Sequence, residues 1–105
     1  MEKITESVLQ LLSEKKAENI KVIDVKGRSP FYDDVIIVTA SNGRAAISFS
    51  EDVLDLLEAK GFDAKKPEGN KESEWIVVDG GDFILHILSE ERRKELSLEE
   101  LLEKN

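Results

Sequence analysis

Two aspartates and the only histidine of this chain lie close together in the sequence. Side chains of these types can carry out acid–base chemistry when they meet in space. Asp79 and Asp82 flank the pair Gly80-Gly81, and His86 follows shortly after. Two carboxylates that approach each other can share a proton or a cation. Aspartate beside glycine is also a common turn residue whose side chain accepts hydrogen bonds from nearby backbone N–H groups, and we favour this interpretation. For His86 we favour an ordinary strand position packed against Trp75, with partner binding as the alternative.

A second carboxylate pair, Asp33-Asp34, follows the turn Gly27-Arg28-Ser29. This order is found at the metal-binding corner of nucleotidyltransferases, where two carboxylates spaced i, i+2 on one strand face hold Mg²⁺. Here the i+2 partners are apolar, so neither aspartate has a second carboxylate on its face. We therefore predict that no metal is bound here and that the chain does not carry out nucleotidyl transfer. The alternative is a nucleotide- or phosphate-binding relative that uses Asp33, Asp34 and Arg44.

The segment from Glu74 to His86 predicts a β-hairpin. Two apolar runs meet at Gly80-Gly81, and glycine accepts the positive φ of a tight turn without steric cost. With these glycines as the two loop residues, Asp79 lies opposite Asp82 and Trp75 lies opposite His86. One face of the hairpin is then wholly apolar and belongs to the core: Ile76, Val78, Phe83, Leu85 and Ile87. The other face is mixed: Trp75, Val77, Asp79, Asp82, Ile84 and His86.

The mixed face is the predicted binding surface. Trp75 is a large aromatic side chain with a polar handle, a type that often anchors protein interfaces. Its neighbours on this face are polar, which favours contact with a partner over burial in the core.

The remaining sequence predicts the elements that position the hairpin. Helical spacing indicates helices over 2–17, over 44–60 and from about residue 90, the last broken near Ser97. Strands are predicted over 20–26 and 34–40, with a short one near 62–66. The chain 1–105 is thus expected to form a single domain of the α/β (α+β) class. It would have a mixed sheet of about five strands with flanking helices.

Composition narrows the class of partner. The net charge is −8, from 23 acidic and 15 basic residues. This charge acts against free nucleic acid, whose binding depends on Lys and Arg, and favours a basic protein. There is no cysteine, no signal-like leader and no apolar run long enough to span a membrane, so we expect a cytoplasmic protein without a membrane partner.

Several short motifs occur together in an order that resembles the Iojap family, the ribosomal silencing factors of bacteria with relatives in organelles. The most specific is the pattern Trp-[Ile/Val]-x-x-Asp-x-Gly-Asp-x-x-x-His, which this sequence matches from Trp75 to His86. The supporting motifs are Asp24-Val25-x-Gly27-Arg28-Ser29, Asp34 with the strand to Thr39, Ser41, Arg44, Val53, Gly61, Glu68-Gly69, Arg93 and Leu98-Glu99-x-Leu101.

The resemblance implies a translational repressor that docks on large-subunit ribosomal protein L-fourteen and sterically blocks association of the ribosomal subunits. It also implies a possible homodimer. The partner-binding residues expected on this basis are Trp75, Asp79, Gly80, Asp82, His86, Leu96 and Leu98. The resemblance further implies a nucleotidyltransferase-like topology in a protein that is not an enzyme and has no cofactor. Four of this chain's residues depart from the family pattern: Gly80 where a bulky residue is common inside the turn, Leu96 in place of tyrosine, Leu102 in place of an aromatic residue, and Glu51 in place of aspartate. The first three are expected at or near the contact surface, where Gly80 would remove a contacting side chain.

Overall fold

The fold is one mixed sheet with helices on both faces. In the computed structural model of the chain, residues 4–62, 65–70 and 72–103 are described, with side chains described through residue 100. The helices are α1 (Ile4–Glu14), α2 (Gly43–Ala59), α3 (Glu90–Leu96) and α4 (Leu98–Glu103). The strands are β1 (Glu18–Asp24), β2 (Asp34–Thr39), β3 (Trp75–Asp79) and β4 (Phe83–Leu88). No helix among the described residues is both long and apolar enough to cross a bilayer.

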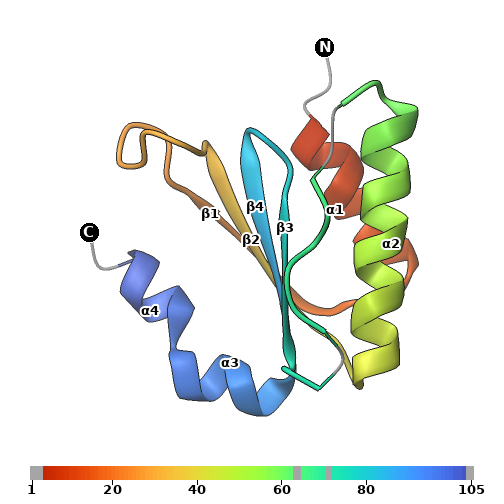
Figure 1. Cartoon of the computed structure of the whole chain (residues 1–105). Helices are drawn as coiled ribbons and strands as arrows, with labels where there is room; N and C mark the ends of the chain where they lie inside the picture. Colours follow the sequence, from red (N-terminus) through yellow and green to blue (C-terminus); the bar gives the residue numbers. More distant parts are fainter. Residues whose placement is uncertain (1–3, 63–64, 71, 104–105) are drawn as a thin grey trace.

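The sheet has the order β1-β2-β4-β3. β2 and β4 are parallel neighbours, and each edge strand pairs with its neighbour in the antiparallel sense. Helix α2 lies in the chain between the two central strands. Figure 1 shows α1 and α2 on one side of the sheet and the short helices α3 and α4 on the other.

The expected mixed α/β fold with flanking helices is confirmed, but the sheet has four strands and not five. The short strand predicted near 62–66 is wrong: residues 62, 65 and 66 are outside any strand, and 63–64 are outside the described residues. The parallel partner of β2 is β4. The segment between α2 and β3 forms a single β-bridge with β3, in which Glu68 exchanges two hydrogen bonds with Val77, at 2.9 Å each. Pro67 has no N–H and Gly69 has φ +104°, so the pairing does not extend into a ladder.

The face of the sheet under α1 and α2 forms the main core, which we call the closed face. The apolar hairpin residues predicted for the core are all at most 2% exposed. They pack against the apolar side chains along one side of α2, of which Val53 and Leu57 are fully buried. They also pack against Val8 and Leu12 of α1. Asn42 caps α2 by accepting a hydrogen bond from the N–H of Ala45 at 2.8 Å.

The two-residue loop of the hairpin lies one residue later in the sequence than predicted, and the pairing of the strands changes with it. Asp79 pairs with Ile84, and Trp75 pairs with Leu88. The Gly80 N–H donates to the Phe83 carbonyl at 2.9 Å, so the two loop residues are Gly81 and Asp82, with Gly81 at φ +91°. A glycine of positive φ at the first loop position is the signature of a type II′ turn. The new pairing shifts each partner by two residues and therefore leaves both hairpin faces as predicted.

The outer edge of β3 is occupied at two successive outward positions. The N–H and the carbonyl of Val77 are both bonded to Glu68, and those of Trp75 are both bonded to the Ser73 hydroxyl, at 3.3 and 2.8 Å. The outward backbone groups of Val77 and Trp75 are thereby satisfied within the chain.

Candidate functional site

The face of the sheet opposite α1 and α2 is only partly covered by the described residues. Over β1 and β2, Leu96 and Leu98 of the C-terminal helices pack on a second buried cluster. The members of this cluster are Ile23, Val25, Val35, Ile37 and Leu88. Along β3 and β4 the side chains are half-buried, and we call this set the hairpin face: Trp75, Val77, Asp79, Ile84 and His86.

Trp75 and His86 form a hydrogen-bonded pair at the centre of the hairpin face. The indole Nε1–H donates to His86 Nδ1 at 3.0 Å, and the two ring centroids are 6.0 Å apart. The residues are diagonal neighbours across the strands, because His86 pairs directly with Val77. Burial lowers the pKa of His86 from its usual 6.5, which favours the neutral ring that this hydrogen bond requires.

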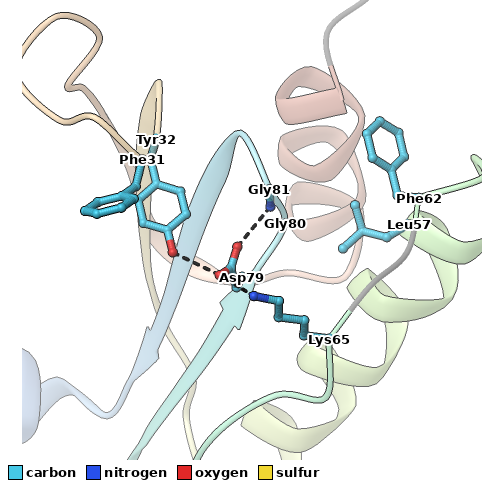
Figure 2. Close-up of a pocket in the computed structure, with 8 residues that line it drawn as sticks. All are labelled: Phe31, Tyr32, Leu57, Phe62, Lys65, Asp79, Gly80 and Gly81. Atoms are coloured by element: carbon cyan, nitrogen blue, oxygen red, sulfur yellow. Dashed lines mark hydrogen bonds and ion pairs between the residues drawn. The ribbon is translucent and has the colours of Figure 1, made fainter.

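Asp79 is held by three groups at the turn end of the hairpin face. Its Oδ2 accepts a hydrogen bond from the Tyr32 hydroxyl at 3.0 Å, and its Oδ1 accepts one from the Gly81 N–H at 3.0 Å. Lys65 Nζ lies 4.0 Å from Oδ2, and Figure 2 shows these groups converging on the carboxylate. Burial, and then the bond and charge of Asp79, raise the pKa of Tyr32 above 10.0. The interpretation of Asp79 as a turn residue is confirmed, and it does not face Asp82.

A pocket of about 290 Å³ opens beside Asp79. Its apolar lining comes from two parts of the chain: Phe31 next to Tyr32, and Leu57 with Phe62 at the end of α2 (Figure 2). The side chain of Phe31 is 77% exposed. The described residues contain no group of three or more histidine, aspartate or glutamate side chains that could hold a metal ion.

The residues proposed for the nucleotide alternative are not brought together. Asp34 is at the first position of β2 and accepts a hydrogen bond from the Thr5 hydroxyl at 3.2 Å, on the side of α1. Arg44 is exposed at the start of α2, beyond the other end of the strand. Five strand steps separate the two ends of β2, which is roughly 17 Å at 3.3 Å per residue.

Arg93 fastens the C-terminal helices to the far side of the sheet. Its side chain is 11% exposed and is paired through Nε with Glu99 of α4. Its Nη1 donates to the Asn19 carbonyl at 2.6 Å and to the Thr39 hydroxyl at 2.9 Å. The hydrogen bond from Arg93 lowers the pKa of Glu99 from 4.5, against the opposing effect of burial, and the charge of Lys21 acts in the same direction as Arg93.

Comparison with known proteins identifies the family. The sequence profile described as "Ribosomal silencing factor during starvation" matches residues 1–105. The chain belongs to the ribosomal silencing factor family. A relative from Haemophilus influenzae, named ribosomal silencing factor, is 31% identical over 98 residues, covering 93% of this chain and 96% of the relative. One of the same name from Bacillus subtilis is 30% identical over 88 residues, covering 84% and 75%.

Two crystal structures share the fold of this silencing factor family member. A protein from Chromobacterium violaceum superposes with a TM-score of 0.89 at 24% identity, covering 97% of this chain and 85% of that one. A protein from Bacillus halodurans superposes with a TM-score of 0.81 at 22% identity, covering 93% and 91%.

In this ribosomal silencing factor family member, most of the predicted partner-binding residues lie in one layer. Trp75, Asp79 and His86 share the hairpin face, and Leu96 and Leu98 pack in the cluster that adjoins Trp75. Asp82 is exposed in the turn. Leu102 lies outside the residues whose side chains are described.

We expected Gly80 to remove a side chain from the contact surface, but its position in the structure has another explanation. It is buried, and a Cβ at this position would lie 2.2 Å from a ring carbon of Phe83. The Phe83 ring already fills the space. Glycine is therefore required by the packing beneath the turn.

Sequence reasoning missed Tyr32 and Lys65, the two partners of Asp79. Tyr32 is 47 positions away in sequence and lies in the loop before β2, where no periodicity indicates its direction. The available signal was its type, since a tyrosine hydroxyl that is partly buried usually finds a hydrogen-bond partner.

Proposed function

We propose that this chain binds the large ribosomal subunit through ribosomal protein L-fourteen, blocks association with the small subunit and thereby represses translation. Membership of the silencing factor family supports ribosome-associated repression, a regulatory and not a catalytic role. The docking surface in this proposal is the hairpin face with Asp82, the backbone of Gly80, Leu96 and Leu98.

The observation that carries the proposal is the half-buried Trp75 on a sheet face that the described helices leave partly uncovered. A rigid aromatic ring whose rotation is already restricted loses little conformational entropy when a partner covers it. Around it, Val77 and Ile84 offer apolar area, while Asp79 and His86 offer polar atoms. This mixture of an apolar centre with polar neighbours is the usual make-up of a protein interface.

Charge supports a basic partner. The net charge of −8 gives the protein a field that speeds encounter with a positively charged protein surface and weakens as salt rises. The same charge acts against contact with the phosphate backbone of ribosomal RNA alone.

The test is co-sedimentation of the purified chain with isolated large ribosomal subunits. Trp75→Ala should remain folded and should lose co-sedimentation, because truncation of a central aromatic anchor typically costs at least about 2 kcal/mol of binding, or about thirtyfold in affinity. The matched control is Phe62→Ala, which removes a 40% exposed aromatic side chain at the end of α2. It should co-sediment like the wild type.

A folded Trp75→Ala variant that still co-sediments fully would remove the hairpin face from the proposal. Loss of binding by both variants would place the contact elsewhere. Binding of the wild type to isolated L-fourteen, and inhibition of subunit joining in a light-scattering assay, test the partner and the steric step separately. Sedimentation velocity of the free chain tests the homodimer.

A further inference from the structure

The hydrogen bond between the only tryptophan and the only histidine of the chain fixes the protonation of the imidazole. An indole N–H can only donate, so His86 Nδ1 must accept and carries no proton. A neutral imidazole has one N–H, which is therefore on Nε2. His86 is half-buried on the hairpin face, and its ring presents Nδ1 to the indole.

We propose that His86 is the positioning residue for Trp75: its unprotonated Nδ1 holds the indole for docking, and protonation of His86 releases the indole and weakens partner binding. The binding half of this proposal rests on the proposed function. The release of the indole does not, and it is measurable in the isolated protein.

The geometry makes acceptance and protonation mutually exclusive. An imidazolium ion is a donor at both nitrogens, so protonation would place two N–H groups against each other at the present 3.0 Å separation. His86 cannot withdraw by moving its strand, because β4 is paired on both sides, with Ile37 of β2 and Val77 of β3 at this position. Relief of this contact therefore requires rotation of one of the two side chains, and in either case the indole N–H loses its acceptor.

The surroundings of His86 favour the neutral ring. Burial lowers its pKa, because the charged imidazolium loses hydration in the half-buried hairpin face. The described titratable and charged residues of the elements around this face are Glu18, Lys21 and Asp24 on β1, Tyr32 and Asp33 before β2, Asp34 on β2, Lys65, Lys66, Glu68 and Glu74 beside β3, Asp79 on β3, Glu90, Glu91, Arg92, Arg93, Lys94 and Glu95 on α3, and Glu99 and Glu100 on α4. The nearest carboxylate on the same face, Asp79, is already bonded to Tyr32 and Gly81.

The experiment is an NMR pH titration of the full chain labelled with ¹⁵N, from about pH 7.5 to about pH 5. One tryptophan gives one indole N–H signal, and one histidine gives one pair of ring nitrogens, so both groups are followed without ambiguity. At neutral pH the ring nitrogens should show the Nε2–H form. The indole signal should then shift with the same midpoint as the imidazole, below 6.5.

Two variants separate positioning from packing. His86→Gln keeps an acceptor oxygen and does not titrate, so its indole signal should remain hydrogen-bonded and constant across the range. His86→Leu keeps apolar volume and offers no acceptor, so its indole signal should have the released position at every pH. An Nδ1–H tautomer, an indole signal that does not follow the imidazole, or a glutamine variant with the wild-type pH response would overturn the proposal.

The binding half is tested by co-sedimentation with large subunits at the same pH values. If only the neutral form docks, apparent affinity should fall about tenfold at one pH unit below the imidazole midpoint, and the glutamine variant should not show this fall. Release of the indole with unchanged ribosome binding overturns the docking role of the pair. Absence of ribosome binding at every pH counts instead against the proposed function and leaves the titration result standing.

Discussion

The two faces of the sheet are built from the same strands but differ in how completely they are covered. On the closed face the hairpin side chains are at most 2% exposed beneath α1 and α2. On the hairpin face they are half-buried, and the C-terminal helices cover this side of the sheet only in part, through Leu96 and Leu98. One face therefore supplies most of the stability, whereas the other keeps apolar area and polar atoms available for a partner.

The sharpest test of this contrast uses neighbouring residues of β4 that point to opposite faces. Leu85 is fully buried on the closed face, and Ile84 is half-buried on the hairpin face. Leu85→Ala should cost about 2–5 kcal/mol of unfolding free energy, because it leaves a cavity in packed surroundings. Ile84→Ala should cost at least about 1 kcal/mol less, since part of its side chain already contacts water. Urea unfolding of both variants measures the difference, and equal losses would contradict the division into two faces.

Arg93 is the buried link between the C-terminal helices and the sheet. Arg93→Met should destabilise the chain by about 1–3 kcal/mol, because it leaves Glu99 and the Thr39 hydroxyl without their donor. Arg92→Met on the same helix is the control, since this side chain is 37% exposed, and its effect should stay within about 0.5 kcal/mol. Similar losses for both variants in chemical denaturation would show that Arg93 is not a special attachment.

The pH dependence of the Arg93 link follows from the lowered pKa of Glu99. A carboxyl group with a lowered folded pKa contributes stability fully above its unfolded value, here 4.5, and loses it as the pH falls through the lower folded value. The difference in unfolding free energy between wild type and Arg93→Met should therefore narrow as the pH falls below 4.5. A difference that stays constant in acid would assign the effect to packing alone.

Tyr32 joins the loop before β2 to the turn end of the hairpin face. Tyr32→Phe removes the bond to Asp79 and should cost about 0.5–1.5 kcal/mol. The remaining partners of Asp79, Gly81 and Lys65, limit the loss. Thermal unfolding should show the decrease, and an unchanged midpoint would mean that water replaces the hydroxyl without cost.

Phe31 should give the smallest effect on stability. Its side chain is 77% exposed, so Phe31→Ser should change the unfolding free energy by less than about 0.5 kcal/mol. A larger loss would show that the pocket beside Asp79 is closed over this ring in solution.

The faces of the hairpin were predictable, but its exact pairing was not. Alternation of side chains assigns faces, and any slip of two residues preserves that assignment. Choosing between Gly80-Gly81 and Gly81-Asp82 as the loop depends on the Phe83 ring, which occupies the space next to Gly80. This contact is tertiary, and local turn propensity does not include it.

The missing fifth strand and the unrecognised Asp79 partners have related causes. The segment around Glu68 is extended, but the flanking Pro67 and Gly69 restrict its pairing to one residue. Tyr32 reaches Asp79 from the loop before β2, where side-chain direction follows no period. In contrast, the stripe of α2, its cap at Asn42 and the break at Ser97 depend on local rules and were all predictable.

The closed edge of β3 limits how any partner can approach. Because Glu68 and Ser73 occupy the outward backbone groups of Val77 and Trp75, another strand cannot extend the sheet at these positions without first displacing them. A partner that docks on the hairpin face beside this edge must then be recognised by side chains. Recognition of this kind depends on a few particular residues, so single substitutions on the hairpin face should be able to redirect the choice of partner while the backbone of the protein stays the same.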